Sequence, residues 1–178
     1  AERFEASVDA DRTAGHPASV SEPACLRVGL VSGDLCAHPV GIFLDDVLRH
    51  VDARRVQVIL YTTREFEDDT TRRLRASAAG WISIAHLTDA EAAARIRDDR
   101  LHVLCDLSGH TGGNRLGVFA YRPAPVQVTW LGYFNTTGME SMDYILCDRY
   151  VVPPEEERYY TEKPWRLPDS YLCFSRPN

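Results

Sequence analysis

With 178 residues, the chain is long enough to bury one sizeable core but short for two full-sized domains. Hydrophobic residues make up 44% and charged residues 26%, and neither an 18-residue apolar run nor a secretory leader occurs, so we expect a cytoplasmic protein without membrane contact. The formal net charge of −6 argues against a nucleic-acid partner. Arg72, Arg73 and Arg75 could together face a phosphate, but we interpret this cluster as the solvated face of a helix.

The cysteines and paired acidic residues do not have the spacing of a metal site. Five cysteines are scattered along the chain and form neither a CxxC pair nor a Cys/His spacing typical of zinc. The DxD sequence, Asp9-Ala-Asp11, lies in a stretch with the composition of a linker. We therefore predict reduced thiols, no catalytic metal and no cofactor.

The N-terminal part of the chain predicts a linker followed by a βαβ unit. Residues 1–25 are rich in Ala, Ser, Glu and Pro and lack a sustained apolar period, which is typical of a linker. An apolar strand is predicted over 26–31, and apolar residues then recur at helical spacing between 43 and 51. A second strand, rich in β-branched residues, is predicted over 56–61.

The same alternation continues to about residue 150. Thr88 and Glu91 have the spacing of a capping box, which predicts the start of a helix. The remaining predicted elements are a helix over 68–79, a strand over 81–85, a helix over 88–98, a strand over 101–107, a helix over 116–121, and strands over 126–131 and 144–147. Strands separated in this way imply right-handed crossovers, so residues 26–150 are predicted to form a Rossmann-like α/β domain with a mostly parallel sheet and helices on both faces.

The final stretch, residues 151–178, has a different character. It contains four prolines before Tyr171, and proline cannot continue regular helices or central strands. We expect this segment to be irregular and either to wrap away from the sheet or to lead into another part of the protein.

Three unusual loops follow strands of the predicted sheet, where open parallel sheets bind their ligands. In the first, SGDLCAHPVG, Asp34 follows the strand and His38 precedes Pro39, a residue that suits the first position of a helix. The Asp could hold the His ring in one tautomer, tune its proton affinity, or itself accept a proton during attack by a hydroxyl nucleophile. The alternative that Asp34 caps the helix and His38 only begins it stays open.

The other two loops are rich in glycine. SGHTGGNR, residues 108–115, could point amides at phosphate or sugar oxygens, although it is neither a P-loop nor a GxGxxG sequence. LGYFNTTG, residues 131–138, could stack on a ring and bind its hydroxyls, or could be only a tight connection that needs positive φ.

Taken in order, these stretches resemble a known family. LRVGLVSGDLCAHPVG, RPAPVQVTWLGY with the TTG that follows it, and MDYILCDRYVVPPEEERYYTEKPWRLPDSYLCF are similar to the protein O-GlcNAc transferase/SPINDLY family over roughly residues 26–174. The resemblance implies the N-terminal lobe of a GT-B glycosyltransferase, preceded by TPR repeats and followed by a C-terminal lobe that holds most nucleotide contacts. The implied reaction transfers GlcNAc from UDP-GlcNAc to Ser or Thr hydroxyls of an acceptor protein, with inversion and without a metal.

The resemblance also implies roles for residues of all three loops. His38 matches a histidine that lies at the sugar and was proposed as a base, and Asp34 matches an aspartate that was also discussed as a proton acceptor. Pro39 completes the His-Pro motif. The residues expected at the acceptor and sugar side are Thr111, Gly113, Arg115, Leu131, Gly132, Tyr133, Thr136 and Gly138.

Several positions depart from the animal members of that family. Val40-Gly41 replaces Thr-Ser, His110 replaces Tyr, Gly112 replaces Lys, and Phe134-Asn135 replaces Pro-Gly. These differences leave open a fucosyl or N-glucosyl transferase of the same family, and also a Rossmann-like module that only scaffolds or binds a partner. The isolated chain is expected to be inactive, because one wall of a cleft cannot position both substrates.

Overall fold

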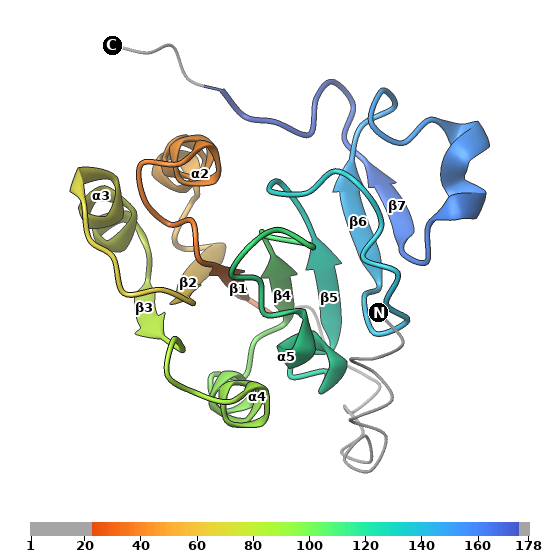
Figure 1. The fold of residues 1–178 in the computed structure, drawn as a ribbon. Helices are drawn as coiled ribbons and strands as arrows, with labels where there is room; N and C mark the ends of the chain where they lie inside the picture. The colour runs from red at the N-terminus through yellow and green to blue at the C-terminus, as the bar shows by residue number, and fades with distance from the viewer. Residues whose placement is uncertain (1–22, 175–178) are drawn as a thin grey trace.

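The computed structural model describes residues 23–174, which form one seven-stranded sheet with every neighbouring pair parallel. The strands are β1 (Leu26–Ser32), β2 (Val56–Thr62), β3 (Gly80–Ser83), β4 (Val103–Asp106), β5 (Val126–Thr129), β6 (Tyr144–Cys147) and β7 (Lys163–Arg166). They lie in the order β3-β2-β1-β4-β5-β6-β7 (Figure 1). The predicted Rossmann-like α/β fold is therefore confirmed.

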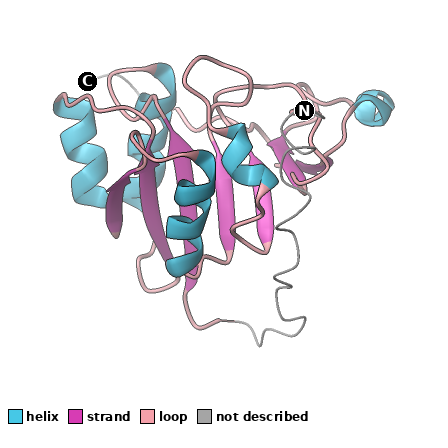
Figure 2. Ribbon diagram, turned by 60° about the horizontal axis from the view of Figure 1, so that its bottom comes forward, coloured by secondary structure: helices cyan, strands magenta, loops and turns pink. Residues whose placement is uncertain are grey.

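Helices cover both faces of the sheet (Figures 1 and 2). The α-helices are α2 (Pro39–His50), α3 (Asp69–Ser77), α4 (Asp89–Asp98) and α5 (Leu116–Ala120). Leu44 of α2 and Leu74 of α3 belong to one buried cluster, whereas Ile96 of α4 and Phe119 of α5 belong to another. The two clusters lie on opposite sides of the sheet, as expected for parallel strands joined by helical crossovers.

Local sequence explains where the helices begin. His38 caps α2 and Pro39 occupies its first turn, where a missing backbone N–H leaves no bond unmade. The predicted capping box is confirmed at α4: the Thr88 amide donates to Glu91 at 2.8 Å, and the Glu91 amide donates to the Thr88 hydroxyl at 3.3 Å.

The strand order reverses at β1, which lies between β2 and β4. Val31 pairs with Tyr61 on one side and with Asp106 on the other, so β1, β2 and β4 end at the same edge. Because the connections after β1 and β4 lead away to opposite faces, the loops at this switch point are where a doubly wound sheet binds ligands.

The expectation that the chain leaves the sheet after residue 150 is wrong for β7. After a 3₁₀ helix, η1 (Pro154–Tyr159), the chain returns and pairs in parallel with β6, from Tyr144↔Lys163 to Cys147↔Arg166. Pro164 is tolerated because β7 is an edge strand, which needs hydrogen bonds on one side only. The prolines at 153 and 154 initiate η1 and do not end the sheet.

The arginines of α3 form the solvated face that was predicted. Their side chains are exposed and pair with acidic neighbours: Arg72 with Asp69, Arg73 with Asp45, and Arg75 with Glu67. Within residues 23–174, no helix is both long and apolar enough to span a membrane. The predicted linker lies, up to residue 22, outside the described residues.

Candidate active site

The loop between β1 and α2 places Asp34 and His38 at the carboxyl edge of the sheet. The Asp34 amide donates to the Ser32 hydroxyl at 3.0 Å, which turns the chain at the end of the strand. His38 caps α2, since its Nδ1 accepts the Val40 amide at 3.3 Å. The alternative in which Asp34 caps the helix is wrong, because the capping acceptor comes from His38. The Asp34 Oδ2 lies 4.0 Å from His38 Nδ1.

The cap decides which nitrogen of the neutral His38 ring carries the proton. A nitrogen that accepts a hydrogen bond from a backbone amide holds no proton itself, so Nδ1 is the unprotonated nitrogen and Nε2 the protonated one. The side chain is 46% exposed and can present Nε2–H to a ligand. In this state His38 is a hydrogen-bond donor.

Arg64, in the loop between β2 and α3, is a third ionisable residue at this edge and was not predicted. Its guanidinium group lies 3.5 Å from Asp34 Oδ1 and donates to the Gly112 carbonyl at 2.9 Å. The neighbouring Thr63 hydroxyl donates to the Gly113 carbonyl at 2.9 Å. Residues 63 and 64 therefore tie the loop after β1 to the loop after β4.

Asp106, the last residue of β4, holds the backbone of the second loop through hydrogen bonds. The fully buried carboxylate accepts the amides of Ser108 at 3.2 Å and Gly109 at 2.6 Å, and the Thr129 hydroxyl at 3.2 Å. Burial raises the pKa of Asp106 to about 6, although these hydrogen bonds act in the opposite direction. Asp106 could have been predicted from the sequence, because it ends a buried strand and lies directly before a glycine-rich loop.

The predicted residues of the second loop have different partners. The Thr111 hydroxyl donates to the Ser108 carbonyl at 2.7 Å, while Gly113 has a φ of 79°, which favours glycine. Arg115 points elsewhere: it donates to Asp89, Ile84 and Leu87 at 2.7–2.8 Å and ties α5 to the loop before α4. The guanidinium group of Arg115 thus has a structural set of partners.

The third loop packs against both of the others. A Cβ at Gly132 would overlap the Leu107 carbonyl oxygen and lie 3.2 Å from Val40. A Cβ at Gly109 would likewise overlap Tyr133, whose ring meets the His110 ring edge-on at 5.7 Å. Leu131 has a φ of 73°, so the chain turns sharply after β5. These glycines let the second and third loops lie in direct contact.

Glu162, just before β7, holds the TTG part of the third loop. Glu162 is 2% exposed, and its carboxylate accepts the Thr136 hydroxyl and the Thr137 amide, each at 2.6 Å, as well as the Thr137 hydroxyl. The Thr136 hydroxyl in turn accepts the Gly138 amide at 2.9 Å. Glu162 was not predicted, because a contact across 25 residues leaves no trace in local sequence.

The three loops therefore meet at one edge, as their positions after parallel strands predicted. Arg64 joins Asp34 to the Gly112 carbonyl, and His38 lies 4.0 Å from Asp34. Gly132 and Tyr133 contact the second loop directly. Pro39 lies at the start of α2, beside His38. Thr136 and Gly138 lie on the side of the third loop that faces Glu162.

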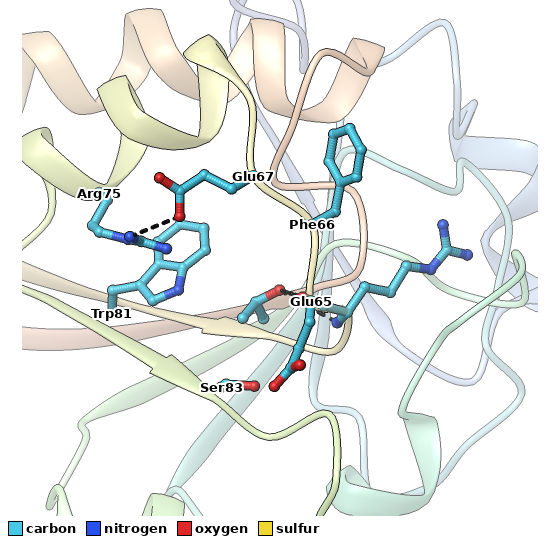
Figure 3. Close-up of a pocket in the computed structure, with 8 residues that line it drawn as sticks. Glu65, Phe66, Glu67, Arg75, Trp81 and Ser83 are labelled. Carbon is cyan, nitrogen blue, oxygen red and sulfur yellow. Dashed lines mark hydrogen bonds and ion pairs between the residues drawn. The ribbon is translucent and has the colours of Figure 1, made fainter.

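A hollow of about 410 Å³ lies next to this edge, over the ends of β2 and β3 (Figure 3). Its lining residues are Thr62, Arg64, Glu65, Phe66, Glu67, Arg75, Trp81 and Ser83. Figure 3 shows Arg75 against the Trp81 ring, with a dashed line to Glu67; the distances are 4.9 Å to the ring centroid and 3.1 Å to the carboxylate. Arg64 borders both the hollow and the three loops, and we assign the candidate site to the loops because Asp34 and His38 lie there.

Within residues 23–174, no group of three or more His, Cys, Asp or Glu side chains is arranged to hold a metal ion. The ionisable side chains that meet at this edge are those of Asp34, Arg64 and His38. Such an edge can accept or donate protons and bind hydroxyl groups.

Comparisons with known proteins agree with this architecture. The family described as Glycosyl transferase family 41 matches residues 10–175. A protein of Arabidopsis thaliana named probable UDP-N-acetylglucosamine--peptide N-acetylglucosaminyltransferase SPINDLY is 36% identical over 154 residues, which cover 84% of this chain and 17% of that protein. A Caenorhabditis elegans protein named UDP-N-acetylglucosamine--peptide N-acetylglucosaminyltransferase is 33% identical over 156 residues, with 86% and 14% covered.

A solved structure is similar over most of the fold. A variant of Thermobaculum terrenum O-GlcNAc transferase superposes with a TM-score of 0.86 at 44% sequence identity and covers 88% of this chain. The match takes in 30% of the solved chain. The present chain thus spans less than a third of each of these three proteins.

Proposed function

Since this chain belongs to glycosyl transferase family 41, we propose that it is the N-terminal lobe of the catalytic region of a protein O-linked glycosyltransferase of the GT-B type. The proposed reaction transfers GlcNAc from UDP-GlcNAc to Ser or Thr hydroxyls of an acceptor protein. The observation that carries the proposal is the meeting of Asp34, His38 and two glycine-rich loops at the switch point of the sheet. The names of the relatives supply the donor and the peptide acceptor.

The chemistry requires help at both ends of the transferred sugar. The acceptor hydroxyl oxygen forms a bond to the anomeric carbon while the bond from that carbon to the diphosphate oxygen breaks, and the electron pair of the broken bond leaves with UDP. Attack from the opposite side inverts the anomeric carbon. The hydroxyl proton goes to a protein group or to the leaving diphosphate, and Asp34 and His38 are the groups of this chain proposed to lie at that proton.

We propose that no metal takes part. Backbone amides, a helix dipole and cations then stabilise the negative charge of the leaving diphosphate. In this proposal the C-terminal lobe contributes most nucleotide contacts, while the loops here position the sugar and the acceptor. The residues assigned to that task are Pro39, Thr111, Gly113, Arg115, Leu131, Gly132, Tyr133, Thr136 and Gly138. Among them, the Arg115 guanidinium group is bound to Asp89, Ile84 and Leu87, and the hydroxyls of Thr111 and Thr136 donate to Ser108 and Glu162.

The test is a transfer assay with the full-length protein. UDP-GlcNAc and a library of Ser- and Thr-containing peptides should give GlcNAc-modified peptides by mass spectrometry, with a rate that EDTA does not change. Exclusive use of GDP-fucose, or transfer to asparagine, would overturn the assignment of donor or acceptor while keeping the family. Loss of activity in EDTA would overturn metal independence.

The proposed division of labour has its own test. Titration of UDP-GlcNAc into this chain should give negligible heat, whereas the full-length protein should bind, because one lobe lacks most of the nucleotide contacts. Tight binding by this chain alone would contradict the division. The proposal also includes a TPR region as a partner within the same polypeptide, and a cytoplasmic location.

A further inference from the structure

We propose that Arg64 is a positioning residue of this site: it holds the Asp34 carboxylate apart from His38, and thereby keeps His38 as the Nε2–H tautomer that donates a hydrogen bond to the substrate. The inference rests on the proposed function and deepens it, because it assigns separate roles to Asp34 and His38. It makes Asp34, and not His38, the group left able to accept a proton.

The Arg64 side chain is held in place although it is half exposed. It passes between glycines of two different loops. A Cβ at Gly33 would lie 3.1 Å from the Arg64 Nε, and a Cβ at Gly113 would lie 2.6 Å from its terminal nitrogen. Side chains at these two positions would displace the arginine. The absence of side chains at Gly33 and Gly113 therefore leaves room for the Arg64 side chain between the loop after β1 and the loop after β4.

The guanidinium group of Arg64 has partners in two loops. One terminal nitrogen of Arg64 donates to the Gly112 carbonyl at 2.9 Å, and the other lies 3.5 Å from Asp34 Oδ1. The same carboxylate lies 4.0 Å from His38 Nδ1 through its other oxygen, which is too far for a hydrogen bond. Asp34 is thus nearer to the arginine than to the histidine.

The tautomer of His38 depends on the partner of its Nδ1 atom. If Asp34 accepted a hydrogen bond from Nδ1, the ring would carry its proton there and leave Nε2 free to act as a base. Instead, Nδ1 accepts the Val40 amide. Since Nδ1 cannot both accept from Val40 and donate to Asp34, the partner of Asp34 decides the tautomer.

The other ionisable groups around this loop leave that competition unchanged. Cys36 lies in the same loop, and burial, Asp68 and Asp34 raise the pKa of its thiol, so it stays neutral at physiological pH. Asp68 from the start of α3 is occupied by the amides of Ala37 and Thr71. Among the described groups around the loop, Arg64 is the cation that contacts the Asp34 carboxylate.

The direct test observes the tautomer and needs no activity. In this chain labelled with ¹⁵N-histidine, NMR in alkaline buffer should show His38 with a protonated Nε2 and an unprotonated Nδ1. Arg64→Met keeps the aliphatic stem between the glycines but removes the charge, and should shift a large part of the population to Nδ1–H. Adding Asp34→Ala to Arg64→Met should return the ring to Nε2–H, because the competing acceptor is then gone.

Matched variants complete the test. Arg75→Met removes a neighbouring exposed arginine that stacks on Trp81 and should leave the His38 spectrum unchanged. Arg64→Lys keeps the charge on a point-like head that cannot reach both partners, and should restore part of the wild-type population. If Arg64→Met does not fold, the Arg64→Lys spectrum decides. A wild-type ring with Nδ1–H, or Arg64 variants with an unchanged spectrum, would overturn the inference.

A transfer assay separates this inference from the proposed function. In the full-length protein, Arg64→Met should lower kcat by about 10- to 100-fold with little change in the KM for the donor, because a misplaced carboxylate costs rate and not binding. A raised donor KM with unchanged kcat would mean that Arg64 contacts the donor, and would overturn the positioning role. If the wild-type protein transfers no sugar, the proposed function fails, while the tautomer still decides the inference on Arg64.

Discussion

The carboxylate of Glu162 accepts the backbone amide of Thr137 at 2.6 Å, although the two residues lie 25 positions apart in the sequence. Glu162 precedes the edge strand β7, whereas Thr137 lies in the loop after β5. The end of the sheet therefore fixes a loop of the candidate site. Without this bond, the Thr137 amide would have no partner in a buried position.

Glu162→Gln should lower the free energy of unfolding by roughly 1–3 kcal/mol, because one amide oxygen cannot replace two carboxylate oxygens with four donors around them. Urea unfolding followed by circular dichroism measures the change. Glu155→Gln, in the exposed first turn of η1, is the control and should stay within about 0.5 kcal/mol of the wild type. Equal stabilities of the two variants would show that the buried carboxylate does not hold the loop.

Asp106→Asn should change how stability depends on pH. Because the folded pKa of about 6 lies above the ordinary value of 3.8, the folded state binds a proton more readily than the unfolded state between these values. The stabilisation from this proton is fully present below about pH 4 and is lost as the pH rises through about 6. The difference in unfolding free energy between wild type and Asp106→Asn should therefore be more favourable to the wild type at pH 4 than at pH 7, by on the order of 2–3 kcal/mol. A difference that is constant over this range would rule out a raised pKa.

Asp34→Asn should lower transfer by the full-length protein by about 100-fold or more, since a proton acceptor is replaced by an amide. The melting temperature should change little, because no backbone group depends on this side chain within the described residues. Asp46→Asn is a matched control: Asp46 lies 4.0 Å from His50 at the same i, i+4 spacing, but near the far end of α2. Loss of stability without loss of transfer in Asp34→Asn would instead support the scaffolding alternative.

His38→Ala should destabilise the protein by about 1 kcal/mol, because α2 loses its capping acceptor. His38→Asn should restore that stability, since Asn is among the best capping residues, yet it should not restore transfer. The measurements are thermal unfolding of this chain and the transfer rate of the full-length protein. Full activity in His38→Asn would mean that the ring acts only as a cap.

Gly132→Ala should destabilise the protein strongly, by roughly 2–4 kcal/mol, because its Cβ would overlap the rigid carbonyl oxygen of Leu107. Gly80→Ala tests the same change in β3, where the nearest atom, Ile59 Cγ2, would lie at 3.4 Å. Soluble yield and urea unfolding compare the two variants. Similar behaviour would show that the contact between the second and third loops contributes little.

The sequence was sufficient to predict most of the sheet, because each strand up to β6 is a short apolar run separated from the next by turn residues or a helical pattern. The position of Asp34, His38 and the two glycine loops at one edge followed from the parallel connections alone. β7 was missed because its local composition, KPWR, argues against a central strand, and only its place at the edge of the sheet makes it acceptable.

The site residues that were not predicted from the sequence were missed for a common physical reason. Arg64 and Glu162 act through contacts made across loops that are distant in the chain, and neither belongs to a motif with a fixed spacing. Asp106 was identifiable from its place at the end of a buried strand, but its hydrogen bonds to the next loop were not. Arg115 was predicted from its position in a motif, but its side chain is bound to Asp89 and two carbonyl groups.

The direct packing of Gly109 against Tyr133 has an evolutionary consequence. A homologue with a larger side chain at position 109 would need a smaller or displaced side chain at position 133. Substitutions in the second and third loops are therefore coupled. Exchanging only one of the two loops between homologues that differ at these positions would cause a steric clash. Exchanging both loops together would keep the contact between them.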